Sequence, residues 1–385
     1  MKIAHIAPPW IAIPPKNYGG AEAAIANLVE EQVAQGHDVT LFSPGNARTS
    51  ARLISFFATS LVDAGVPWHA HLKAHYHYCK ALEYVKIHTF DILHLHLASS
   101  SDMYAYPLAS LMNIETPLIT TLHSRFPFDR TPSLEEKTDW TGDADRYYLD
   151  WLARTPLVAL SKSACMDIPF PLNVVGVIYY GLPLNSFQPT TYRPGTYLAW
   201  IGRIIADKGP HHAIAAAKAM DMPLVLAGTV DSRIPESVQY FEEQIKPYID
   251  GKQIRYIGPV NLTQKTDLLS RARGFLNPIE WNEPFGLVMV EAMAAGCPVI
   301  SFSRGAAPEL IAHGKSGFLV RDVEEMTGLI PELDSLDRRT VRAHVEENFS
   351  IQLMAERYSE IYKRSIAEQS TAMYERTATK KLFSL

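Results

Sequence analysis

The sequence predicts an α/β protein made of two Rossmann-like domains that face each other across a cleft. A chain of 385 residues is long enough for two domains, each with its own core, at about 100 to 200 residues per domain. Short apolar stretches alternate with helical stretches along most of the chain, which is the βαβ pattern of a parallel sheet. A break near the middle separates two such series.

The first series predicts an N-terminal domain over residues 1–182. An early helix is expected at 21–35, closed by Gly36, because a glycine just past the last periodic residue is a common helix end. The strands of this domain are expected at 2–7, 37–43, 91–97, 117–123, 157–161 and 173–179.

The second series predicts a C-terminal domain over residues 190–345, after a hinge in which turn-forming residues interrupt the periodicity. Its strands are expected at 197–202, 223–227, 253–257, 274–277, 298–302 and 317–320. Apolar residues at helical spacing then predict a long helix at about 350–368. The polar tail from about Thr371 is expected to be frayed.

Composition narrows the classes of protein to which the chain belongs. Apolar residues make up 47% and charged residues 20%, and no apolar run reaches the length of a membrane span, so we expect a soluble chain without a stable membrane anchor. The net charge of -5 disfavours nucleic acid as a partner. Three scattered cysteines and the lack of an export signal favour a cytoplasmic protein.

The strongest local signal for a binding site lies between Trp281 and Pro298. Pro284 is expected in the first turn of a helix, so that Glu283 stands at the helix start and Glu291 two turns further on. The backbone amides at this end attract phosphate or sugar oxygens. The residues that would offer them are Phe285, Gly286, Leu287 and Val288. The alternative is that both glutamates are ordinary helix carboxylates.

A second signal follows the strand expected at 197–202. Gly202 allows a diphosphate to approach the backbone closely, and Arg203 and Lys208 follow in the same turn. Two cations here are suited to a diphosphate whose negative charge grows as a sugar departs. A solvated loop with an arginine and a lysine is the alternative.

A third signal is the loop between the first strand and the first helix, where Gly19 and Gly20 are placed to offer backbone amides to a phosphate. A simple turn before a helix is the alternative. The loop lacks the GxGxxG spacing, so no nicotinamide cofactor is predicted.

Together these motifs resemble the family-4 retaining glycosyltransferases of the GT-B fold. The early Gly-Gly loop of that family matches 18–22, its Gly-Arg and Lys-Gly pairs match Arg203 and Lys208, and its two glutamates match Glu283 and Glu291. Further similar segments lie at 91–96, 121–123, 177–182 and 307–311.

The resemblance implies the role of each candidate residue. Arg203 and Lys208 would hold the donor diphosphate, Glu283 the sugar hydroxyls and Glu291 the ribose hydroxyls. Backbone groups of Phe285 to Val288 would contact sugar and phosphate in a nucleotide-sugar-binding C-terminal domain. Gly19 and Gly20, and His123 beside the donor sugar, would act from an acceptor-binding N-terminal domain, onto which the helix at 350–368 crosses back.

The resemblance also implies the substrates. The nucleotide-sugar donor, by family default a uridine compound such as UDP-glucose, is a co-substrate, and no cofactor is expected. The acceptor would be a small molecule or a glycan. The oligomeric state is not predicted.

The expected mechanism is front-face transfer with retention, because no carboxylate is clearly placed as a nucleophile. No metal is expected. Asp143 and Asp145 form a DxD pattern, but they lie away from the cationic turn and are interpreted as chance. The histidines of 69–77 and Cys79 are also metal-like, with His71, His75 and Cys79 on one potential helix face, but this helix is interpreted as lining or flanking the acceptor cleft. His94 and His96 share a strand face and are interpreted as structural.

Two other functions are compatible with these residues. A sugar-nucleotide epimerase on the same scaffold would form its product without an acceptor, and a non-catalytic nucleotide-sugar-binding protein would bind the donor without consuming it.

Overall fold

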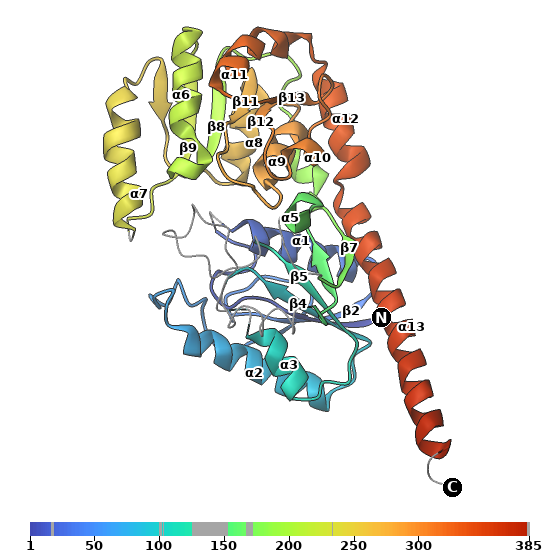
Figure 1. The fold of residues 1–385 in the computed structure, drawn as a ribbon. Helices are drawn as coiled ribbons and strands as arrows, with labels where there is room; N and C mark the ends of the chain where they lie inside the picture. The colour runs from blue at the N-terminus through green and yellow to red at the C-terminus, as the bar shows by residue number, and fades with distance from the viewer. Residues whose placement is uncertain are drawn as a thin grey trace. The chain divides into compact units, whose positions relative to one another are not determined.

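The computed structural model describes residues 1–16, 19–99, 102, 104–124, 153–166, 172–232 and 234–382, with side chains described as far as 370 in the last range. The chain divides into two compact units (Figure 1). Unit 1 comprises Met1–Leu160, Cys165–Tyr179 and Gln352–Leu385, and unit 2 comprises Ser161–Ala164 and Tyr180–Ile351. No helix in the described part of the chain is both long and apolar enough to cross a bilayer.

Unit 1 contains a seven-stranded sheet of order β3-β2-β1-β4-β5-β6-β7, in which every neighbouring pair is parallel. The strands are β1 (Lys2–Ile6), β2 (Asp38–Phe42), β3 (Arg52–Ile54), β4 (Ile92–Leu97), β5 (Leu118–Leu122), β6 (Leu157–Ala159) and β7 (Val174–Val177). All except β3 were predicted. β3 has only three residues and begins with an exposed arginine, so it carries no apolar alternation to reveal it.

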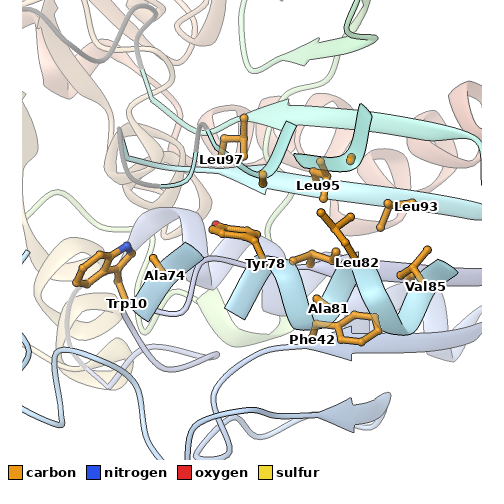
Figure 2. Close-up of a cluster of buried hydrophobic side chains, with 14 of the residues drawn as sticks. Trp10, Phe42, Ala74, Tyr78, Ala81, Leu82, Val85, Leu93, Leu95 and Leu97 are labelled. Atoms are coloured by element: carbon orange, nitrogen blue, oxygen red, sulfur yellow. The ribbon is translucent and has the colours of Figure 1, made fainter. Parts of the chain in front are cut away.

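One face of this sheet is covered by α2 (His71–Ile87) and α3 (Ala105–Leu111), as Figure 2 shows for α2. Tyr78 and Leu82 of α2 are completely buried against Leu93 and Leu95 of β4. Because successive strand residues point to opposite faces, these leucines and the intervening His94 lie on different sides of β4.

The opposite face packs against α1 (Gly20–Ala34) and α13 (Ile351–Leu382). The approach of α13 is close, since a Cβ at Gly176 of β7 would lie 2.5 Å from Ile361. The long C-terminal helix therefore returns to the first domain, as predicted. α13 continues as a helix to Leu382, beyond the end predicted at about 368.

Unit 2 contains a six-stranded parallel sheet of order β10-β9-β8-β11-β12-β13. Its strands are β8 (Leu198–Arg203), β9 (Leu224–Thr229), β10 (Ile254–Tyr256), β11 (Gly274–Asn277), β12 (Val299–Phe302) and β13 (Gly317–Val320). Its helices are α6 (Pro210–Ala219), α7 (Pro235–Tyr240), α8 (Leu262–Arg271), α9 (Leu287–Ala294), α10 (Ala307–Leu310), α11 (Val323–Leu329) and α12 (Arg338–Asn348), and α5 (Ser163–Met166) lies where the chain alternates between units. The predicted pair of Rossmann-like folds is confirmed.

Arg338 of α12 is a buried cation that holds backbone carbonyls of unit 2. Its guanidinium donates to the Ala272 oxygen at 2.6 Å and to the Arg273 oxygen at 2.8 Å, and a longer contact of 3.3 Å reaches the Gly296 oxygen. These carbonyls depend on the guanidinium for their hydrogen bonds. The residue is only 3% exposed, so water does not reach the site to take its place. It therefore ties α12 to the segments before β11 and after α9.

Replacing Arg338 by methionine is expected to lower the free energy of unfolding of unit 2 by about 2 kcal/mol, because buried carbonyls lose their donors. Denaturant unfolding measures the change. Arg339→Met is the matched control, since the neighbouring side chain is exposed and lies over the Tyr192 ring at 4.5 Å, and it is expected to cost less than about 1 kcal/mol. Equal losses in both variants would contradict this role.

Candidate functional site

Two loops of unit 2 meet at the carboxyl ends of adjacent strands. β8 leads through a short 3₁₀ turn, Ala206–Lys208, into α6, and neighbouring β11 leads through 278–286 into α9. The Glu280 amide donates to the Asp207 oxygen at 2.8 Å. Gly209 has a φ of 64°, and a Cβ there would lie 2.0 Å from the Pro278 oxygen. Only glycine therefore permits this approach, which is why Lys-Gly stands at this turn.

The side chains of Lys208 and Glu283 form an ion pair where these loops meet. The ammonium also lies over the Trp281 ring, 5.2 Å from its centre. The side chains are 20% and 16% exposed, so each is sheltered without being sealed from solvent. An ammonium has three donors and a carboxylate two oxygens, which leaves both groups with capacity to bind a ligand.

Arg203 and Gly202 end β8 in register with Thr229 and Gly228 of β9. A Cβ at Gly228 would lie 1.8 Å from the Gly202 oxygen, and one at Gly202 would lie 3.1 Å from the Trp200 indole. The close packing of these two strand ends fixes where the backbone before Arg203 runs. Arg203 is thus placed at the same edge of the sheet as Lys208, five residues earlier in the chain.

The predicted start of the helix at Pro284 is wrong. α9 begins at Leu287, and Gly286 precedes it with a φ of 87°, a left-handed conformation that no regular helix contains. Pro284 and Phe285 therefore lie in the loop, as does Glu283, whose carbonyl accepts from the Ala306 amide at 3.0 Å. The Met289 amide donates to the Gly286 oxygen at 3.0 Å, so the first amides of α9 are those of Leu287 and Val288.

Glu291 lies inside α9 and is 7% exposed. Its carboxylate accepts from the ammonium of Lys265 at 2.5 Å, and Lys265 comes from α8. Sequence reasoning missed this lysine because no motif links it to Glu291, which is 26 positions away. The lysine compensates a carboxylate that burial would otherwise disfavour.

In unit 1, Gly19 and Gly20 begin α1 at the carboxyl end of β1. Gly19 has a φ of 146°, and a Cβ there would lie 2.7 Å from a carboxylate oxygen of Glu22 and 2.9 Å from Pro15. Burial raises the pKa of Glu22 to about 7. Tyr18, the residue of the predicted motif that precedes Gly19, lies outside the described residues.

His123 directly follows β5, and its amide donates to the Leu97 oxygen at 2.8 Å. Its ring nitrogen Nε2 lies 2.9 Å from Nδ1 of His96. Burial lowers the pKa of His123 to about 3, so the imidazole is neutral at physiological pH.

The metal-like motifs of the sequence form no ligand cluster in the described residues. Asp143 and Asp145 lie outside these residues, and His71, His75 and Cys79 follow one another along α2. In the described part of the chain, ligand atoms lie within 4.8 Å of one another in two other groups, His5-His94-His96 and His211-His212-Glu280. Neither group was predicted as a metal site.

Comparisons with known proteins match both halves of the chain. The family model described as Glycosyltransferase Family 4 matches residues 18–164, and the model described as Glycosyl transferases group 1 matches residues 184–338. The chain belongs to the family-4 glycosyltransferases. The resemblance noted in the sequence, with its GT-B fold, is thereby confirmed, and sugar transfer from a nucleotide sugar is the activity of this glycosyltransferase.

Relatives and solved structures extend over nearly the whole glycosyltransferase. It is 24% identical to spore coat protein SA of Bacillus subtilis, over 95% of this chain and 100% of that protein. Sucrose-phosphate synthase from Thermosynechococcus elongatus has the same fold with a TM-score of 0.77 at 18% identity, covering 96% of this chain and 100% of the other. The structure of Anabaena HepE in complex with UDP and glucose has a TM-score of 0.69 at 17% identity. The match covers 94% of this chain and 100% of the other.

Proposed function

We propose that this glycosyltransferase is a retaining hexosyltransferase that uses a UDP-sugar of the UDP-glucose type. The acceptor is a hydroxyl of a small molecule or a glycan, and transfer needs no metal. HepE binds UDP and glucose on the same fold, which supports a uridine donor without fixing the sugar.

The pairing of Lys208 with Glu283 is the observation that carries the proposal. A cation for phosphate and an acceptor for sugar hydroxyls must lie side by side where a glycosidic phosphate bond is cleaved, and these two groups contact each other. The charges of the pair cancel, so a diphosphate needs a further cation, which Arg203 supplies at the end of β8. The amides of Leu287 and Val288 add donors at the positive end of α9.

Glu291 is assigned to the ribose hydroxyls of the donor. One of its oxygens is held by Lys265, and a carboxylate can bind two adjacent hydroxyls with its remaining acceptor sites. His123 is assigned to the donor sugar and the loop at Gly19 and Gly20 to the diphosphate, as the family resemblance implies.

The proposed chemical step is a front-face substitution. The bond between the anomeric carbon and the diphosphate oxygen breaks, and the pair of electrons leaves with the diphosphate. The acceptor oxygen forms its bond to the same face of the anomeric carbon, and its proton passes to the departing phosphate oxygen. Lys208 and Arg203 stabilise the growing charge of the diphosphate, which replaces the role that a metal has in other transferases.

A panel of nucleotide sugars, scored by thermal shift and by slow donor hydrolysis, tests the proposal. We expect UDP-glucose to stabilise the protein by about 2.7 kcal/mol at a hundred times its Kd and to be hydrolysed slowly, with EDTA present or absent. Loss of turnover on chelation would contradict metal independence. A product formed without acceptor or water would indicate an epimerase, and binding without consumption a non-catalytic protein.

A further inference from the structure

Three side chains of unit 2 that are suited to bind a metal ion come together at the start of α6. His211 and His212 lie in the first turn of this helix, and Glu280 lies in the loop between β11 and α9. One ligand atom from each residue lies within 4.8 Å of the other two. In a tetrahedral zinc site with bonds of about 2.0 to 2.2 Å, neighbouring ligand atoms are roughly 3.3 Å apart. Small side-chain rotations therefore bring these three groups to the spacing of a metal site.

The two imidazoles lie side by side although they belong to consecutive residues. Neighbouring positions of a helix usually point in different directions. Here the ring centres of His211 and His212 are only 3.9 Å apart, and Nε2 of His212 lies 3.0 Å from Oε1 of Glu280. The side chains of His212 and Glu280 are 25% and 41% exposed, so an ion can reach them from solvent.

The Tyr240 hydroxyl of α7 orients the first imidazole. Nδ1 of His211 lies 2.6 Å from this hydroxyl, and the two rings meet edge to face. A histidine that binds a metal through one ring nitrogen commonly donates its other N–H to a fixed acceptor, which sets the tautomer and the ring orientation. With the Nδ1 proton directed at the Tyr240 oxygen, Nε2 of His211 has the lone pair that a metal needs.

A second histidine group in the described residues, His5-His94-His96 of unit 1, also brings ligand atoms within 4.8 Å of one another. All six ring nitrogens of that group already take part in hydrogen bonds, for example from Nδ1 of His5 to Nε2 of His96 at 2.9 Å. A metal there would have to break several of these bonds in a fully buried site. In the group on α6, by contrast, only the contact between His212 and Glu280 has to open.

The chemistry of the three groups selects the class of ion. Two imidazoles and one carboxylate suit zinc and the neighbouring transition metals, whereas Mg²⁺ and Ca²⁺ require several oxygen ligands. Two positive charges also lie close by, namely the N-terminal end of α6 and the guanidinium of Arg304, which donates to the Glu280 carbonyl at 2.6 Å. An ion that binds here must therefore form strong bonds to nitrogen and cannot be held by charge alone.

We propose that His211, His212 and Glu280 form a binding site for a divalent transition-metal ion such as Zn²⁺, with water as the fourth ligand. The Glu280 amide already donates to the Asp207 oxygen at 2.8 Å, so the ion joins the same two loops at a second point. None of the three ligands is assigned to the nucleotide sugar. The ion therefore stabilises unit 2, and turnover does not require it.

Titration of the full chain, stripped with EDTA and then freed of the chelator, tests the proposal. We expect calorimetry to show Zn²⁺ bound at this site, Co²⁺ to give the visible absorption of a tetrahedral complex, and the melting temperature to rise with Zn²⁺ concentration. Mg²⁺ is expected to give none of these signals.

Substitutions of the ligands and of their supporting tyrosine locate the bound ion. His212→Gln and Glu280→Gln each remove a ligand and are expected to lower the Zn²⁺ affinity by about a hundredfold or more. Tyr240→Phe keeps the ring and removes the hydroxyl, and it is expected to lower the affinity by about tenfold. Glu280 is exposed, so Glu280→Gln tests the site even if a substitution on α6 impairs folding.

His75→Gln is the matched control. His71 and His75 lie one turn apart on α2 with ring centres 6.4 Å apart, which is the other exposed arrangement of histidines on a helix in the described chain that could attract Zn²⁺. This variant is expected to leave the affinity of the proposed site unchanged.

Absence of Zn²⁺ and Co²⁺ binding by the native protein would overturn the proposal. So would binding that His212→Gln and Glu280→Gln both retain, or a preference for Mg²⁺ over Zn²⁺. Turnover does not enter these measurements, so a failure of the proposed donor chemistry would leave their outcome unchanged.

Discussion

Lys208→Ala is expected to lower turnover by roughly two orders of magnitude, and Arg203→Ala by a similar factor, because each variant removes a cation that stabilises the departing diphosphate. Removal of one well-placed donor to a developing anion typically costs about 2.7 to 4 kcal/mol. For Lys208 the loss also leaves Glu283 without its partner, so the orientation of the carboxylate at the sugar is disturbed. Steady-state kinetics with the donor found by the panel measures both effects.

The separation of kcat from KM shows whether the cations act in the transition state. A fall in kcat with little change in the KM of the donor indicates that the interaction is made mainly as charge develops on the diphosphate. Lys246→Ala is the matched control, because Lys246 also pairs with a glutamate of unit 2, Glu242 at 2.5 Å, but on an exposed surface. Near-normal turnover in both site variants would refute the assigned role.

The sequence was sufficient to predict every strand of the two sheets except β3, with limits that differ from those of the structure by at most two residues. β11 (Gly274–Asn277) and β13 (Gly317–Val320) begin and end where the sequence predicted. Both are short runs of mostly apolar residues that begin with a glycine, and strands buried on both faces of a parallel sheet are mostly apolar. The motif residues are also at strand ends, because ligand sites of such sheets form at that edge.

The start of α9 could not be predicted, because a proline before a helical run is usually its first residue. Here Gly286 adopts a positive φ, which a glycine takes as readily as a negative one, so the residue type does not tell which conformation occurs. The sign of a glycine dihedral is set by tertiary contacts, so the limits of such a helix are uncertain by several residues.

The sequence also could not predict which partners the buried polar groups would have. Lys265 pairs with Glu291 and Gln32 with His5 across separate elements, and neither pair has a characteristic spacing. His94 and His96 were correctly placed on one strand face by the period of two, but the hydrogen bonds that join His96 to His5 and His123 require the order of β1, β4 and β5 in the sheet.

Acidification from pH 6.5 to pH 4 is expected to destabilise unit 1 strongly. Burial lowers the pKa of His5 and of His77 from 6.5 to about 4, so the unfolded chain binds protons in this window that the folded unit does not. The contribution of each neutral, buried histidine to the free energy of unfolding is fully present above pH 6.5. It is lost as the pH falls toward 4. A shift of this size corresponds to about 3 kcal/mol for each residue, and His94, His96 and His123 shift in the same direction.

Glu22 has the opposite effect on the pH dependence of the stability of unit 1. Burial raises the pKa of Glu22 from 4.5 to about 7, so its contribution to stability is complete below pH 4.5 and is lost as the pH rises through 7. Glu22→Gln is therefore expected to recover up to about 3 kcal/mol above pH 7 and to make the acid loss steeper between pH 7 and 4.5.

Hydrogen exchange of the amides of β1 and α2, measured between pH 4 and 8 and corrected for the intrinsic exchange rate, follows the stability of unit 1 separately from that of unit 2. His77→Gln keeps a donor for the Ala7 oxygen, which Nε2 of His77 contacts at 3.0 Å, but cannot be protonated. This variant is expected to reduce by about 3 kcal/mol the stability that unit 1 loses between pH 6.5 and pH 4. His69→Gln, at an exposed position, is expected to leave the pH profile of stability unchanged. An acid profile that is the same in the native protein and in His77→Gln would show that this imidazole becomes protonated without unfolding.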